Sequence, residues 1–249
     1  MKKFIGGLVG SLMIGGVALA GGGHVVKWGY VGKIGPAHWG DLAHEYFMCK
    51  VGKNQSPVDI NSSVTIEAQL EPINFHYRDQ ISGEIVNNGH TIMVVPKEDN
   101  YIVVDGKKFH LKQFHFHSPS EHTVEGKYYL LELHFVHQAD DGQLAVIGVV
   151  FDRGAEHPEI AKLWKEAPEH EGKKELKSLV NMQALLPENL DYYRYSGSLT
   201  TPPCSEGVIW LFLKNPLQIS EAQAEKFKKI MGFENNRPVQ PVNARKILK

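Results

Sequence analysis

Three histidines at regular spacing could together hold a metal ion. His115 and His117 lie two residues apart, and His134 follows in a second apolar run. Side chains of a β-strand point alternately to opposite faces, so His115 and His117 would share one face of a strand. Two such strands side by side would gather three imidazoles on one face of a sheet. Three imidazoles with one open position are typical of a catalytic Zn²⁺ site, where the metal lowers the pKa of its bound water to about 7.

The alternative is that these are ordinary exposed histidines, because the chain has 13 histidines in all. Two polar neighbours favour the metal site. Metal-bound histidines usually donate their second N–H to a carboxylate, an amide or a carbonyl group. Gln113 precedes His115 on the same face, and Glu132 precedes His134 in the same way. We therefore predict zinc ligands at His115, His117 and His134, with Gln113 and Glu132 supporting two of the rings.

Longer blocks of the sequence resemble the alpha-class carbonic anhydrases. They follow that family's order and cover roughly residues 28 to 247; they are Trp28-Gly29-Tyr30, Gly35-Pro36, His38-Trp39, Gln55-Ser56-Pro57-Val58-Asp59-Ile60, Asn87-Asn88-Gly89-His90, Ser120-Glu121-His122-Thr123-Val124, Glu132-Leu133-His134-Phe135-Val136, Tyr195-Ser196-Gly197-Ser198-Leu199-Thr200-Thr201-Pro202-Pro203-Cys204, Arg237-Pro238 and Gln240-Pro241. The resemblance implies a single α+β domain, mostly β, around a twisted and mostly antiparallel central sheet with a few short peripheral helices. It also implies zinc at the base of a conical cavity.

The resemblance further implies an attack of zinc-bound hydroxide on carbon dioxide, which gives bicarbonate and a proton. Thr200 matches the residue that orients the hydroxide. A hydroxyl group has one hydrogen to donate. If Glu121 accepts that hydrogen bond, Thr200 must accept one from the hydroxide and so fixes its direction. His122, beside Glu121, is expected to be structural and to lie on the opposite strand face if the strand continues.

Carbon dioxide is small and apolar, so its site needs a hydrophobic wall. The residues that match the family's substrate pocket are Thr200 and its neighbours Leu199 and Thr201, together with Val136, Val146, Val208 and Trp210. Gln113 and Thr201 would line the polar half of the cavity.

Regeneration of the hydroxide requires that a proton leave the site. A group with a pKa near 7 accepts such a proton better than bulk water does. His90 matches the family's proton-shuttle histidine and is expected at the cavity rim. Tyr30 and Asn88 match residues that order the intervening water molecules.

The first residues predict export. Residues 1–20 combine Lys2-Lys3, an apolar run and Ala18-Leu19-Ala20, which is typical of a secretory signal peptide. An uncleaved membrane anchor is the alternative, but the run is Gly-rich and shorter than the ~20 residues that a span needs. We therefore expect residues 21–249 to be the catalytic domain, located in the periplasm or secreted.

The two cysteines, Cys49 and Cys204, fit an oxidising compartment. We expect a disulfide between them, and two unpaired buried thiols are the alternative. A disulfide would anchor the segment that carries Thr200.

Composition limits the partners. The formal net charge is −1 at pH 7, and the sequence has no basic patch or nucleic-acid motif. We expect small-molecule substrates, carbon dioxide and bicarbonate, with no nucleic acid and no stable membrane insertion. The oligomeric state is left open, a homodimer included.

Hydrophobic alternation predicts the elements that position these residues. The predicted strands are 83–96, 101–104, 112–117, 128–136, 144–151 and 208–213. The predicted helices are 158–167, 173–181 and 220–231, the last with Ser220 and Gln223 as a capping box and Gly232 as its stop.

Two other function classes compete with this interpretation. His115, His117 and Glu121 are spaced like the ligands of a cupin, which would make the protein a metal-dependent oxygenase or isomerase. A cupin's second Gly, Pro and His motif is missing downstream, and the Thr200 segment would have no role. A non-catalytic binding module is also disfavoured, because all three zinc histidines are present.

Overall fold

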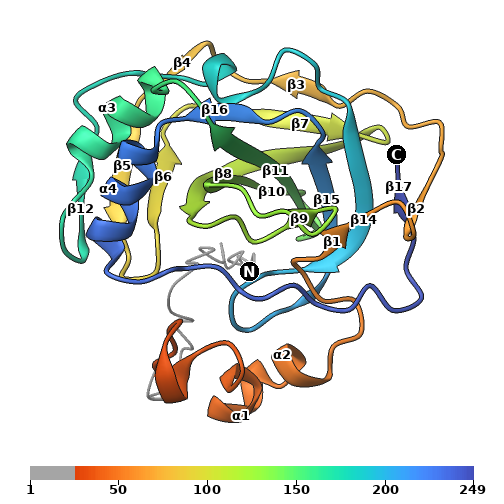
Figure 1. Cartoon of the computed structure of the whole chain (residues 1–249). Helices are drawn as coiled ribbons and strands as arrows, with labels where there is room; N and C mark the ends of the chain where they lie inside the picture. The colour runs from red at the N-terminus through yellow and green to blue at the C-terminus, as the bar shows by residue number, and fades with distance from the viewer. Residues whose placement is uncertain (1–25) are drawn as a thin grey trace, which may run out of the picture.

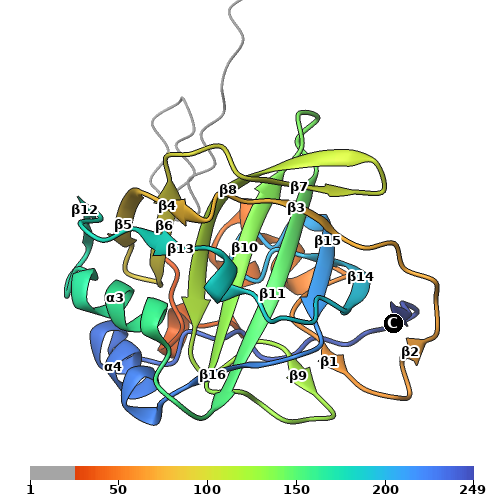
Figure 2. The same cartoon turned by 90° about the horizontal axis from the view of Figure 1, so that it is seen from above.

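The computed structural model describes residues 26–249, so the predicted signal peptide at residues 1–20 lies outside the described residues. Strands dominate this part of the chain and form one large twisted sheet of 13 strands and two small sheets, β1-β9 and β13-β4, with few and short helices around them (Figures 1 and 2). The prediction of a mostly β, α+β domain is therefore confirmed.

The element bounds follow chain order. The strands are β1 Asp59–Ile60, β2 Thr65–Ile66, β3 Asn74–His76, β4 Gln80–Ile81, β5 Gly83–Asn87, β6 Ile92–Pro96, β7 Tyr101–Val104, β8 Lys107–His117, β9 Thr123–Val124, β10 Leu131–Gln138, β11 Leu144–Arg153, β12 Gly172–Glu175, β13 Val180–Asn181, β14 Tyr192–Ser198, β15 Glu206–Leu213, β16 Leu217–Ile219 and β17 Ile247–Leu248. The helices are α1 Trp39–Leu42, α2 Met48–Val51, α3 Pro158–Glu166 and α4 Glu221–Met231, with 3-10 turns η1 Gly32–Ile34, η2 His44–Tyr46 and η3 Gln183–Leu185.

The strands β8, β10 and β11 lie side by side in the middle of the sheet. The order along its main path is β12-β5-β6-β8-β10-β11-β15-β14-β17-β2. Most neighbours are antiparallel, whereas β11 pairs in parallel with β15 and with β16. A strand that is central and covered on both faces must be apolar throughout, and β11 is buried along most of its length.

The two faces of the central strands serve different purposes. On one face, Phe114, Phe116 and Phe135 are fully buried in the larger apolar core. The helices α3 and α4 cover this core, where Trp164 of α3 packs edge-to-face on Phe116 at 4.8 Å between ring centroids. The opposite face carries the three histidines and a smaller apolar cluster that includes Trp210.

The predicted end signals of α4 are confirmed. The Ser220 side chain accepts a hydrogen bond from the backbone N–H of Gln223, and the Gln223 side chain accepts one from the backbone N–H of Ser220. Gly232 ends the helix in the left-handed conformation, with φ 77°, where glycine has no Cβ to clash.

Two predictions of secondary structure are wrong. The predicted strand 83–96 is a hairpin, because Asn88 turns the chain between β5 and β6. Its side-chain oxygen accepts hydrogen bonds from the backbone N–H groups of His90 and Thr91, a local competition with strand pairing that Asn favours.

The predicted helix 173–181 is instead the edge strand β12 followed by a loop and β13. Pairing with β5 holds residues 172–175 extended. The Glu166 carboxylate then accepts hydrogen bonds from the backbone N–H groups of Lys177 and Ser178, which fixes the loop that follows β12. The strands and α-helices outside the predicted ranges are strands β1 to β4, β9, β14, β16 and β17 and the short helices α1 and α2.

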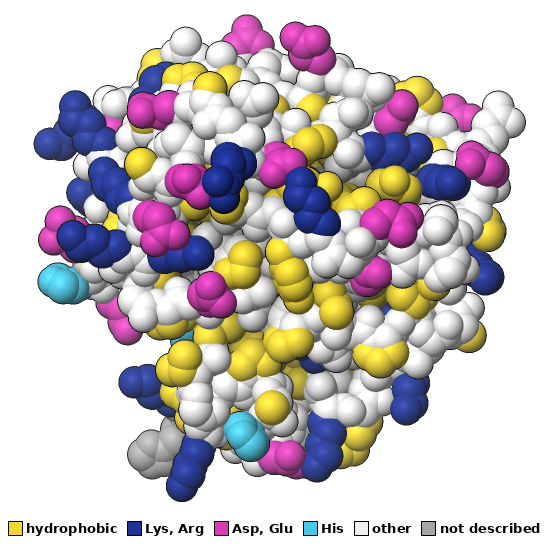
Figure 3. Space-filling model, in the orientation of Figure 1, with side chains coloured by type: hydrophobic (Ala, Val, Ile, Leu, Met, Phe, Trp, Pro, Cys, Tyr) yellow, Lys and Arg dark blue, Asp and Glu magenta, His cyan; other side chains and the backbone are white. Residues whose placement is uncertain are grey.

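The face shown in Figure 3 has basic and acidic side chains interspersed, and hydrophobic side chains gather near its centre. Among residues 26–249, no helix combines the length and the apolar character needed to cross a bilayer.

Candidate metal centre

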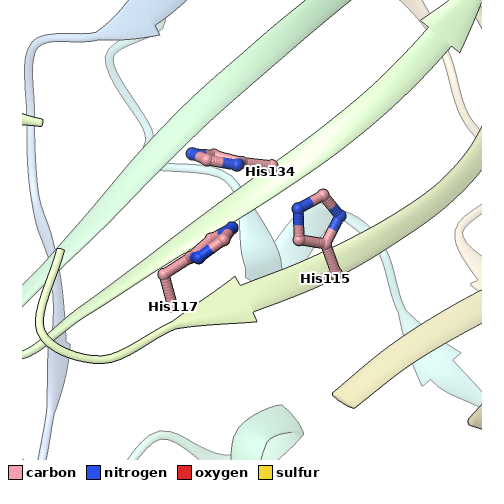
Figure 4. A group of neighbouring side chains, drawn as sticks. All are labelled: His115, His117 and His134. Atoms are coloured by element: carbon pink, nitrogen blue, oxygen red, sulfur yellow. The ribbon is translucent and has the colours of Figure 1, made fainter. Parts of the chain in front are cut away.

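Register between β8 and β10 brings the three predicted ligands together. His134 pairs opposite His115, and Glu132 pairs opposite His117. One ligating nitrogen from each of the three histidines can be chosen so that all lie within 4.8 Å of one another. Figure 4 shows the three rings turned toward a common point between the two strands.

Each ring is held by a hydrogen bond from the nitrogen that faces away from that point. His115 donates from Nδ1 to Oε1 of Gln113 at 2.8 Å. His134 donates from Nε2 to Oε1 of Glu132 at 2.7 Å. Two of the three supports are thus the residues that the sequence indicated.

The third support could not be predicted. His117 donates from Nδ1 to the backbone carbonyl of Asn235 at 2.7 Å, across 118 positions of sequence. The Asn235 side chain also accepts a hydrogen bond from the backbone N–H of Ser118 and donates one to the carbonyl of Phe116. These two bonds fix Asn235 to the end of β8. A backbone carbonyl carries no residue-type signal, so no sequence pattern pointed to it.

The inward nitrogens are suited to bind a cation. Nε2 of His117 is buried and has no hydrogen-bond partner among the described residues. Burial lowers the pKa of His117 to about 3, and it also lowers the pKa of His115 and of His134. The rings are therefore neutral at pH 7, the form in which imidazole ligates a metal.

Glu132 connects the three histidines to a fourth buried histidine, His122. Its Oε2 accepts hydrogen bonds from the backbone N–H groups of Glu121 and His122, each at 2.8 Å. Its Oε1 also accepts from Nδ1 of His122 at 2.7 Å. Burial alone would raise the pKa of Glu132, but His122 and His134 hold it well below its usual range.

His122 is buried within this network. Its Nε2 accepts a hydrogen bond from the Tyr195 hydroxyl at 2.6 Å. It lies beyond the end of β8, which stops at His117, so the strand-face placement expected for a continued strand does not apply. His122, Glu132 and His134 could also be grouped as metal ligands by distance, but their hydrogen bonds to one another and to Tyr195 use the atoms concerned.

Glu121 lies against the three histidines. Its Oε1 accepts the backbone N–H of Arg237 at 2.8 Å, and its Oε2 lies 3.5 Å from Nε2 of His117. Oε2 is buried and has no fully formed hydrogen bond among the described residues. Burial raises the pKa of Glu121 well above its usual range, and the neighbouring Thr200 hydroxyl opposes this rise.

A small cavity of about 20 Å³ opens beside the histidines, close to the space that one water molecule needs. Its lining combines two of the histidines with most of the predicted substrate wall: His115, His134, Val136, Val146, Leu199, Thr200, Thr201 and Trp210. Val208 does not line this cavity but packs in the same apolar cluster as Trp210.

Cys49 and Cys204 form a disulfide between α2 and the segment that carries Thr200. The segment is also closed on itself, because the backbone N–H of Cys204 donates to the carbonyl of Thr201 at 2.9 Å. Arg237 donates to the carbonyl of Cys49 at 3.1 Å. The disulfide therefore ties the Thr200 segment to the residue that binds Glu121.

His90 lies outside the cluster of three histidines. Its ring stacks on Trp28, with 3.8 Å between ring centroids and 7° between planes. Tyr30, Asn88 and His90 line the same pocket, whose volume is about 500 Å³. Burial lowers the pKa of His90.

Known proteins resemble this chain along nearly all of its length. A carbonic anhydrase of Pectobacterium atrosepticum is 44% identical over 239 residues, which span 96% of this chain and 97% of that protein. The alpha-carbonic anhydrase of Thermovibrio ammonificans, solved with the inhibitor sulfanilamide, is 58% identical with a TM-score of 0.88. The match covers 91% of this chain and 100% of that one.

The Photobacterium profundum alpha-carbonic anhydrase is 48% identical, with a TM-score of 0.84, and the match covers 90% of this chain and all of that one. The family model for eukaryotic-type carbonic anhydrases matches residues 34–249. This match excludes the cupin alternative. The chain belongs to the eukaryotic-type, or alpha-class, carbonic anhydrase family and is a carbonic anhydrase enzyme.

Proposed function

We propose that the protein uses one Zn²⁺ to interconvert carbon dioxide and water with bicarbonate and a proton, and that His90 assists the proton transfer. The observation that carries this proposal is the set of three buried, neutral imidazoles. In each ring, one nitrogen donates a hydrogen bond to a neighbouring group, and the second nitrogen points toward the space between the three rings.

The donor set fits zinc. The outer nitrogens are occupied, which leaves Nε2 of His115, Nε2 of His117 and Nδ1 of His134 as the ligand atoms. The orphaned Nε2 of His117 is a buried polar atom without a partner, which a cation would satisfy. A zinc ion held by three imidazoles lowers the pKa of a coordinated water to about 7 and so supplies hydroxide at neutral pH.

Thr200 and Glu121 would orient the nucleophile. Arg237 already occupies Oε1 of Glu121, so Oε2 is the acceptor left for the Thr200 hydroxyl. Once Thr200 donates there, its lone pairs can only accept. Thr200 then holds the incoming water ligand in one direction and turns away any ligand that has no proton to donate.

Val136, Val146, Leu199 and Trp210 form the apolar side of the cavity beside Thr200. Moving carbon dioxide from water to this apolar surface costs little free energy. Moving the bicarbonate anion there costs much more, because the anion gives up its hydration. The wall therefore favours entry of the substrate and departure of the charged product. Val208 would support this wall from within the same cluster.

His90 would carry the proton between the site and solvent. Its ring belongs to a pocket of about 500 Å³, shared with Tyr30 and Asn88, that has room for bridging water molecules. A lone imidazole accepts a proton near neutral pH more readily than water does.

We also propose that residues 1–20 are removed and that the enzyme acts in the periplasm or after secretion. The disulfide supports this proposal, because such bonds persist in oxidising compartments.

Stopped-flow hydration of carbon dioxide tests the proposal. Purified protein should bind one zinc per chain, lose activity when a chelator strips the metal, and recover it when zinc is restored. Full activity of the metal-free protein would overturn the zinc mechanism. Absence of hydration by the zinc-loaded protein would overturn the proposed reaction.

A further inference from the structure

Strand pairing sets Glu171 beside the turn that carries His90. Glu171 is the residue before β12, and Gly172 pairs opposite Asn87 at the end of β5. The Asn87 side chain also donates to the carbonyl of Pro168 at 3.0 Å, which ties this loop to the turn. Glu171 therefore lies next to the residues that immediately precede His90.

The approach of Glu171 to this turn is close. A Cβ atom added to Gly89 would lie 2.5 Å from Oε1 of Glu171, so the carboxylate lies directly against this turn. Gly89 also has φ +79°, a backbone conformation that glycine adopts without strain.

Glu171 and His90 line one pocket, and the imidazole has a nitrogen without a hydrogen-bond partner among the described residues. Nδ1 of His90 is buried and has no hydrogen-bond partner among the described residues. The ring is held flat on Trp28. Glu171 lines the same pocket of about 500 Å³. A carboxylate thus shares a pocket that has room for water molecules with an imidazole that has a buried nitrogen without a partner among the described residues.

The other titratable groups around the ring come from the N-terminal segment. Lys27, Tyr30 and Tyr46 line the same pocket, and burial raises the pKa of both tyrosines, so they are neutral at pH 7. Burial is the main cause that lowers the pKa of His90, Glu171 opposes that effect, and Lys27 adds to it. Among the described residues that line this pocket, Glu171 is the one anionic side chain.

We propose that Glu171 is a positioning residue for proton transfer, whose carboxylate favours the protonated ring of His90 in its position stacked on Trp28. The proton that His90 accepts from the active-site water passes from there to a buffer base in solution, and Glu171 keeps its own charge throughout. This inference rests on the proposed role of His90.

The test compares Glu171→Gln with Glu169→Gln, a matched loss of charge two residues earlier in the loop, where the side chain does not line the pocket. Proton NMR titration of the zinc-loaded enzyme would give the pKa of His90, with the His90→Ala variant assigning the signal. Glu171→Gln should lower that pKa by about half a unit, the effect of one water-screened charge at short range. Lys27→Gln should raise it, and Glu169→Gln should leave it unchanged.

The rate of proton transfer should change together with the pKa of His90. In weak buffer, Glu171→Gln should lower kcat about twofold and shift its pH profile, while kcat/KM stays constant because hydration itself is untouched. An unchanged His90 titration in Glu171→Gln overturns the inference, whatever the kinetics show. A shifted titration with unchanged kcat, while His90→Ala does lower kcat, overturns the claim that Glu171 assists transfer. Unchanged kcat in His90→Ala identifies a different failure, that of the proposed shuttle.

Discussion

The backbone N–H of Arg237 donates a 2.8 Å hydrogen bond to Oε1 of Glu121, and the side chain of Arg237 fixes where that N–H lies. The buried guanidinium group donates to the carbonyls of Cys49 and Ser56 and to Oε1 of Gln55. Five donors in a rigid fork suit such a multiple anchor. Glu121 is therefore held from one side, and its second oxygen is left facing the metal centre.

This relationship predicts that Thr200 and Glu121 act as a unit. Glu121 would matter only by taking the one hydrogen that Thr200 can donate. Thr200→Ala and Glu121→Gln should each lower kcat/KM roughly 100-fold, the scale for loss of an orienting hydrogen bond. The double variant should cost about as much as either single change, with zinc content measured as one per chain throughout. Additive losses in the cycle would show that the two residues act independently.

The metal centre predicts a specific effect of removing one ligand. In His134→Ala, two imidazoles remain, so zinc content after dialysis should fall well below one per chain. Hydration activity should drop roughly 100-fold or more. His76→Ala removes an exposed strand histidine and is the matched control, which should keep both metal and activity. Metal analysis beside stopped-flow rates decides the result, and a fully metallated, active His134→Ala would refute the ligand assignment.

The disulfide predicts a loss of stability on reduction. Cys49 and Cys204 are 155 positions apart, and closing a loop of that length is worth at most about 5 kcal/mol in the chain-entropy model. The Cys49→Ala/Cys204→Ala variant should therefore unfold at lower denaturant concentration. Its kcat/KM should also fall, because the Thr200 segment loses an anchor. Equal denaturation midpoints for the two proteins would contradict this prediction.

Proton transfer predicts a split between two kinetic constants. His90→Ala should lower kcat in weak buffer about tenfold and leave kcat/KM nearly unchanged, since His90 does not take part in hydration. Added imidazole should restore much of the lost kcat, because a small base can enter the pocket and accept the proton. Equal losses in both constants, with no rescue, would assign His90 another role.

Acid should destabilise the fold through His137. This buried residue accepts a 2.7 Å hydrogen bond from the Tyr77 hydroxyl at Nε2, and burial lowers its pKa to about 3. Between about pH 6.5 and pH 3 the unfolded chain therefore binds a proton at this site that the folded chain does not. The free energy of unfolding falls as pH decreases through that window, by up to about 1.4 kcal/mol per unit from this residue.

Urea titrations of wild type and the Tyr77→Phe/His137→Phe double variant, repeated from pH 7 to pH 4, measure this contribution. The double variant leaves no hydroxyl without a partner, so its pH dependence should be shallower by about one proton. His44→Phe, a change at an exposed position, is the control. An unchanged slope in the double variant would mean that His137 is not a source of acid sensitivity.

The sequence by itself determined the features that depend on neighbouring residues. Alternation along two strands placed His115, His117 and His134 on one face, together with Gln113 and Glu132, because strand geometry repeats every two residues. The capping box of α4 was equally local. Hydrophobic runs predicted the central strands, since a strand covered on both faces must be apolar.

Only the tertiary structure decided the contacts that join distant segments. The carbonyl of Asn235 on His117 and the N–H of Arg237 on Glu121 are backbone groups, which every residue type offers. The stretch 172–175 became a strand because β5 was there to pair with it, and that pairing set Glu171 beside His90. Such contacts depend on which distant segments the fold brings together, and the local propensity of a segment contains no information about its distant neighbours.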